Sequence, residues 1–171
     1  MRGLRAVLAV LAVAALATPV AVAGTSLHVN GGGQGTFGKD LDNDGDIDGS
    51  HFGIGVVFSG SSVRGHFECL MAGNADILGL PLMAVQGTVM TGSVGADTVS
   101  IAGTATVNLG NGIMFKNVPF QVVLHAGGPG VGQLQLTVIG AFDGVPGDTT
   151  TGNGNYDLPP ETVATGQISI R

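Results

Sequence analysis

Residues 98–110 read TVSIAGTATVNLG, and apolar or small side chains occupy every second position of this stretch. One set comprises Val99, Ile101, Gly103, Ala105, Val107 and Leu109, and Ser100, Thr104, Thr106 and Asn108 lie between them. Successive side chains of an extended chain point to opposite faces, so this period of two predicts a β-strand with one buried face.

The same alternation recurs along most of the chain, with no sustained helical period. It appears at 52–58, 63–71, 83–89, 120–124, 134–138 and 168–170, and a first strand is expected at 26–30. About eight short strands separated by turn signals such as Gly110-Asn111-Gly112 predict an all-β fold. An antiparallel sandwich is favoured, with a small closed β-barrel as the alternative. Gly65, Gly87 and Gly103 occupy inward positions, which favours a strongly curved sheet.

The composition excludes several classes of protein. The chain has 171 residues, of which 44% are hydrophobic, so it is not intrinsically disordered. A single cysteine excludes a disulfide framework and multi-cysteine metal sites. Twelve acidic residues against six basic ones argue against nucleic acid as a partner.

The N-terminus has the three parts of a secretory signal peptide. Arg2 and Arg5 precede an apolar run at 6–17, and Ala21-Val22-Ala23 is a small-residue cleavage pattern. We therefore expect a leader at 1–23 and one secreted, periplasmic or envelope domain at 24–171. The run is too short for a spanning helix, and no later segment is suited to one. Removal of the leader would leave four basic and twelve acidic residues, a net charge of −8.

Five of the twelve acidic residues lie in one loop, 40–48, which reads DLDNDGDID and fits D-x-D-x-D-G-x-x-D. Calcium prefers six to eight oxygen ligands, and carboxylates one residue apart can converge in a tight turn that contains glycine. The predicted ligands are the side chains of Asp40, Asp42, Asp44 and Asp48 and the backbone carbonyl of Asp46. Ile47 is expected to point into the core and anchor the loop.

Two known calcium loops share this spacing. EF-hand and dockerin loops need an acidic twelfth residue and flanking helices, but His51 stands at that place and strand-like sequence follows. The loops between strands of integrin-type propeller blades use the nine-residue pattern as it stands, and we favour that geometry. The alternative is a solvated acidic turn that holds no ion.

The other candidate groups are weaker. Arg64, His66 and Glu68 share one face of a predicted strand, about 6.6–6.8 Å apart, where a solvent-facing role is favoured over acid–base chemistry. Cys69 lies on the apolar side of that strand and is expected to be buried and inert. No catalytic set is apparent. The long irregular segment 143–161 is expected to be either functional or mobile.

Several short phrases resemble those of a known group of proteins. They are Gly31-Gly32-Gly33-Gln34, Phe52-Gly53, Gly65-His66-Phe67-Glu68-Cys69-Leu70-Met71, Asn117-Val118-Pro119-Phe120, Gly127-Gly128-Pro129-Gly130 and Gly166-Gln167-Ile168-Ser169-Ile170. With them, the chain resembles Gly-rich secreted bacterial β-domains of the post-COAP type. Thr165 stands where the group often has the first glycine of a pair. The resemblance implies secretion and β architecture, and it adds nothing about chemistry, since it offers no established catalytic residues to carry over.

Two functions are consistent with these features. The first is a secreted, non-enzymatic structural or binding domain that calcium stabilises and that acts on an extracellular or envelope partner. The second is a small secreted β-barrel enzyme or carrier for an apolar ligand, which would use a barrel mouth and the face of Arg64, His66 and Glu68. If the second is correct, those three side chains should line a concave cavity.

Overall fold

The computed structural model describes residues 26–41 and 43–171, so the predicted leader at 1–23 lies outside the described part of the chain. The described residues form nine β-strands and the segments that connect them. The strands are β1 (Leu27–Thr36), β2 (Gly49–Ser59), β3 (Ser62–Ile77), β4 (Leu80–Val94), β5 (Thr98–Gly110), β6 (Ile113–His125), β7 (Gln133–Val138), β8 (Tyr156–Asp157) and β9 (Glu161–Ile170).

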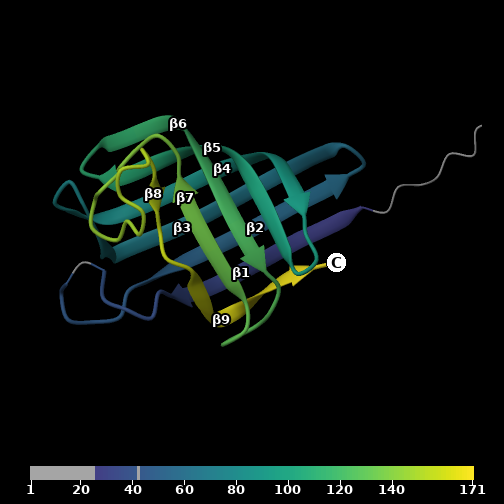
Figure 1. Cartoon of the computed structure of the whole chain (residues 1–171), viewed down its shortest axis with the longest axis horizontal. Coiled ribbons are helices and arrows are strands. Elements are labelled where there is room, and N and C mark those ends of the chain that lie inside the picture. Colours follow the sequence, from purple (N-terminus) through teal and green to yellow (C-terminus); the bar gives the residue numbers. More distant parts are fainter. Residues whose placement is uncertain (1–25, 42) are drawn as a thin grey trace, which may run out of the picture.

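The strands form one antiparallel sheet that returns on itself. Its order is β6-β5-β4-β3-β2-β1-β9-β7-β8, and β6 also pairs with β7. The joint between β7 and β9 is the shortest of the ring, with Gln133 opposite Thr162 and Leu134 opposite Glu161. In Figure 1, β6 and β7 lie in front of β2 and β3 and cross them at a steep angle. The all-β prediction is confirmed, and this ring agrees with both a sandwich and a barrel.

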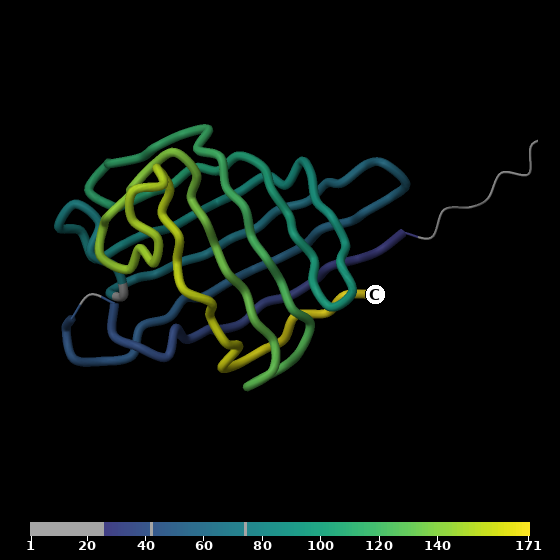
Figure 2. The backbone as a smooth tube through the Cα atoms, in the orientation of Figure 1, coloured from purple at the N-terminus to yellow at the C-terminus, as the bar shows by residue number. Residues whose placement is uncertain are grey.

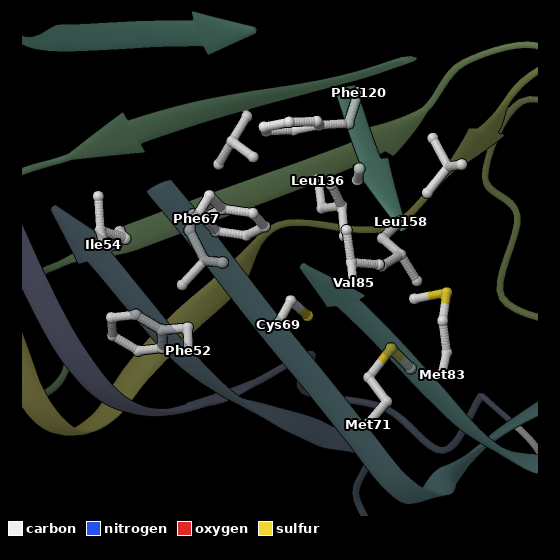
Figure 3. Packing of buried hydrophobic residues seen from close by; sticks show 14 of the residues in the cluster. Phe52, Ile54, Phe67, Cys69, Met71, Met83, Val85, Phe120, Leu136 and Leu158 are labelled. Atoms are coloured by element: carbon white, nitrogen blue, oxygen red, sulfur yellow. The ribbon is translucent and has the colours of Figure 1, made fainter. Parts of the chain in front are cut away.

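The core fills the space that the ring encloses. The inward residues of the alternating strands, such as Val99 and Ile101 of β5, are buried, as the period of two predicts. Figure 3 shows apolar side chains from β2, β3, β4, β6 and β7 that meet in this interior, together with Leu158. The rings of Phe67 and Phe120 stack across it with centroids 5.8 Å apart. Packing of this kind between opposite sides of the ring stabilises the closed sheet.

Gly87 supports this packing because it has no side chain. A Cβ atom built on Gly87 would lie 2.5 Å from the Phe120 ring, which is buried and stacked on Phe67. The inward glycine of β4 therefore leaves the space that the Phe120 ring occupies. This agrees with the prediction that inward glycines serve close packing in a curved sheet.

The connections gather at two ends of the ring. The loop that joins β1 to β2, the turns β3–β4 and β5–β6, and the segment between β7 and β8 lie at one end, on the left of Figure 1. In Figure 2, the segment between β7 and β8 passes over that end of the ring. Tyr156 and Leu158 follow it and are buried in the core. The described residues include no helix that is long and apolar enough for a bilayer crossing.

The fit of Phe120 over Gly87 can be tested with Gly87→Ala. The added methyl group must displace a packed ring, so we expect the free energy of unfolding to fall by about 1–3 kcal/mol in urea denaturation. Gly32→Ala in β1 is the matched control, because its Cβ would have its nearest contact at 3.6 Å. The control is expected to be neutral or slightly stabilising. Equal destabilisation by both substitutions would contradict the role assigned to Gly87.

Candidate functional site

The acidic loop 40–48 is held at its base by backbone hydrogen bonds next to β1 and β2. The Phe37 N–H donates to the Asp48 carbonyl at 3.0 Å, and the Asp48 N–H donates to the Lys39 carbonyl at 3.2 Å. Phe37 and Leu41 are both buried in the core. The loop is therefore anchored at both ends, while Asp44 and Asp46 are exposed to solvent.

The carboxylates of two aspartates in the loop accept hydrogen bonds from backbone N–H groups of the same loop. One oxygen of Asp40 accepts the Asn43 N–H at 2.5 Å, and the other accepts the Gly45 N–H at 2.9 Å. Asp44 accepts the Asp46 N–H at 3.1 Å. The turn requires a positive φ at Asn43 (64°) and at Gly45 (107°), where glycine avoids the steric cost of a Cβ atom. The glycine at the sixth place of the pattern therefore has the turn-forming role that the sequence predicts.

Asp48 occupies the inward position at the end of the loop, and the prediction for Ile47 is wrong. Asp48 is fully buried and accepts a hydrogen bond from the Leu41 N–H, whereas Ile47 is 56% exposed. Neighbouring residues of an extended chain face opposite sides, so the inward turn of Asp48 forces Ile47 outward. Leu41, and not Ile47, supplies the apolar anchor of the loop.

The loop concentrates negative charge. The neighbouring carboxylate of Asp44 raises the pKa of Asp46, with smaller contributions from slight desolvation and from the carboxylates of Asp48 and Asp40. Carboxylate and carbonyl oxygens match the preference of calcium for oxygen ligands. Asp42 lies outside the described residues. Among the residues that are described, no three His, Cys, Asp or Glu side chains already stand in a metal-binding group.

A second polar cluster lies inside the ring near this end, and the sequence reasoning did not find it. Glu161, the first residue of β9, is buried and accepts a hydrogen bond from the Ser50 hydroxyl of β2 at 2.7 Å. Burial raises the pKa of Glu161 to about 7, and the Ser50 hydrogen bond offsets part of the shift. Its carboxylate occupies the space beside Gly35, since a Cβ atom built on Gly35 would lie 2.4 Å from Oε2 of Glu161. Residues two apart in a strand share a face, so an inward Val163 is the signal that would have placed Glu161 on the inner face as well.

The weaker candidate groups lie where the sequence places them, with one set facing solvent and the cysteine in the core. Arg64, His66 and Glu68 are exposed on the outer face of β3. Cys69 is buried, and burial raises the pKa of its thiol, with Glu161 adding to the effect. A buried thiol with a raised pKa is a poor nucleophile, as expected for an inert core cysteine.

The long segment 143–161 is organised by side-chain hydrogen bonds. Asp143 accepts the N–H groups of Gly152 and Gly154, at 2.7 and 2.9 Å. Asp148 accepts those of Gly144, Thr150 and Asp157, at 2.8 to 3.2 Å. These bonds close the segment over one end of the core, where the Tyr156 hydroxyl donates to the Pro146 carbonyl at 2.9 Å.

Together, these features define an all-β domain whose concentrated charge lies in a loop at one end of a closed antiparallel sheet. Comparison of the chain with known protein families, with curated proteins and with solved structures finds no match. The resemblance to post-COAP-type domains therefore stays a prediction.

The buried carboxyl of Glu161 predicts a specific pH dependence of stability. Its pKa is raised in the folded state, so the unfolded chain ionises first as the pH rises from about 4.5. The contribution of Glu161 to stability therefore falls through this window and levels off above pH 7, a loss of about 3 kcal/mol. Glu161→Gln keeps the shape of the side chain but cannot ionise. The free energy of unfolding of this variant, relative to that of the wild type, should therefore rise across the same pH window. Urea denaturation with calcium present measures it.

Glu68→Gln is the matched control, because Glu68 is exposed on the outer face of β3. Its stability relative to the wild type is expected to change little between pH 4 and pH 8. If the difference between Glu161→Gln and the wild type were independent of pH, the raised pKa of Glu161 would be refuted.

Proposed function

We propose that the protein is a secreted, non-enzymatic structural or binding domain, and that calcium stabilises it through the loop 40–48. The proposed ligands are the side chains of Asp40, Asp42, Asp44 and Asp48 and the backbone carbonyl of Asp46. The domain would act outside the cell or in the envelope, where calcium concentrations are high enough to occupy weak sites.

The arrangement of the loop is the observation that carries this proposal. Asp40 and Asp44 bend the loop through backbone hydrogen bonds, and Asp48 is buried where the loop enters β2. Two carboxylates 4 Å apart repel by about 4 kcal/mol at an effective dielectric constant of 20. A divalent cation between them converts this repulsion into attraction, so calcium would favour the folded loop.

The position of the loop supports a stabilising role for the ion. The loop connects β1 to β2, and the Phe37 N–H donates a hydrogen bond to the Asp48 carbonyl at its base. An ion that ties the two ends of this loop together would strengthen the junction of two neighbouring strands of the ring. A ligand at one hundred times its dissociation constant adds about 2.7 kcal/mol when it binds only the folded state.

The alternative of a barrel enzyme or carrier receives less support. It requires Arg64, His66 and Glu68 to line a concave cavity. All three are exposed, and the shallow depression of about 260 Å³ that Glu68 borders on the outer face of β2, β3 and β4 is not lined by Arg64 or His66. Inward side chains from opposite sides of the ring also occupy its interior, where an apolar ligand would have to lie.

Calcium is expected to raise the melting temperature of the protein by about 5–10 °C over the value in a chelator. Asp44→Ala removes one proposed ligand, and a tenfold loss of affinity would reduce that rise by about half. The measurement is thermal unfolding followed by circular dichroism, with and without calcium.

Asp97→Ala is the control, because Asp97 is an exposed aspartate in the β4–β5 turn at the opposite end of the ring. It should leave the response to calcium intact. A melting temperature that calcium does not change, in the wild type and in Asp44→Ala alike, would eliminate the calcium site.

A further inference from the structure

The outer face of the sheet carries apolar side chains in two neighbouring rows near the acidic loop. Leu70 of β3 pairs with Ala84 of β4, and the row continues through Asn108 to Met114 of β6. The next row pairs Ala72 with Leu82, whose side chain lies 3.3 Å from the Cβ position of Gly110 on β5. Paired residues share one face of a sheet, so these side chains form a continuous surface.

Ile47 extends this surface onto the acidic loop. It lines a depression of about 300 Å³ together with Leu70 and Ala72. Ile47, Leu70 and Met114 are all exposed. We call the set the apolar outer band, and it consists of Ile47, Leu70, Ala72, Leu82 and Met114.

The band ends sharply at the next row along the strands. There, Gly53 pairs with Glu68, Glu68 with Gln86, and Gln86 with Thr106. This polar row separates the apolar outer band from the rest of the outer face. A contiguous apolar patch with a polar rim is typical of an interaction surface.

The rim of the band is mostly acidic. Glu68 borders it on the sheet, and the exposed Asp46 lies next to Ile47 in the loop. Asp44 and Asp76 line a further depression, of about 270 Å³, with Leu80 and Pro81 of the β3–β4 hairpin. Two exposed basic side chains lie nearby, Lys39 directly before the loop and Lys116 within β6. The five aspartates of the loop, together with Glu68 and Asp76, outweigh these two lysines, and the formal net charge of the whole set is −3 with one calcium ion bound.

We propose that the apolar outer band is a docking surface for a polypeptide segment that presents apolar side chains flanked by lysine or arginine. The apolar side chains would cover the band, and the basic ones would face Glu68, Asp76 and the loop. A second copy of this chain would bring the same acidic loop and the same negative charge. An anionic membrane would meet the same repulsion, so charge complementarity favours a basic segment.

This inference names the partner of the binding role in the proposed function and rests on that role, but not on calcium. The calcium response of the melting temperature tests the ion site. The binding described next tests the band, so either can fail without the other.

The probe is a short fluorescent peptide of alternating leucine and lysine, titrated with the full protein in calcium and followed by fluorescence anisotropy. A peptide of alternating leucine and glutamate is the control and is expected not to bind. Met114→Gln should weaken binding of the lysine peptide about five- to tenfold. Met90→Gln is the matched control, because Met90 is 59% exposed and Met114 53%, and Met90 lies near the other end of β4. It should have no effect.

The charge of the rim is tested separately. Glu68→Gln should weaken binding about threefold at low salt, with less effect at high salt, and Asp97→Asn should not. Equal binding to Met114→Gln and Met90→Gln, with unchanged melting temperatures, would overturn the proposal. So would tighter binding to anionic phosphatidylserine vesicles than to the peptide, or a dimer in sedimentation analysis that Met114→Gln dissociates.

Discussion

Closure of the sheet is the constraint on which the rest of the molecule depends. The strands form a ring only because β6 pairs with β7 and β9 joins β7 to β1. The β7–β9 joint is short, and Glu161 lies in it, opposite Leu134. The ring therefore has its least extensive backbone pairing where a carboxyl group is buried, and the Ser50 hydroxyl supplies the hydrogen bond that this group needs. Packing across the interior, such as Phe67 against Phe120, compensates for the short joint by holding opposite sides of the ring together.

A filled interior also decides where recognition is able to occur. Apolar side chains from both sides of the ring occupy the space between the strands, and the described buried polar groups are Asp48, Ser50 and Glu161. All three lie toward the end at which the acidic loop joins β2. Chemistry directed at other molecules is thereby left to the loops and the outer face. At that same end, the loop 40–48 and the apolar outer band adjoin each other through Ile47. Concentrated charge and exposed apolar surface are thus adjacent at this end of the sheet.

The period-two pattern made the strands predictable, because burial of one face acts on every second residue along the chain. β3, β4, β5, β6 and β7 all contain the alternating segments expected of them. The expectation for Ile47 came from the calcium-loop pattern instead and is wrong, since Asp48 takes the inward position there and accepts the Leu41 N–H. The period-two pattern overlooked Glu161, because a charged residue at an inward position violates the alternation. The acidic loop was evident from spacing alone, but Asp40 acting as acceptor for Asn43 and Gly45 depends on backbone conformation.

By itself, the sequence determined an all-β fold, the positions of most strands and one loop rich in carboxylates. These are local properties, set by alternation and by residue spacing over a few positions. Only the tertiary structure decided that β6 meets β7, that Glu161 is buried against Ser50, and that Leu70, Leu82 and Met114 share one exposed surface. Each of these depends on the register between strands that are distant in sequence, and register is set by how the closed ring packs as a whole.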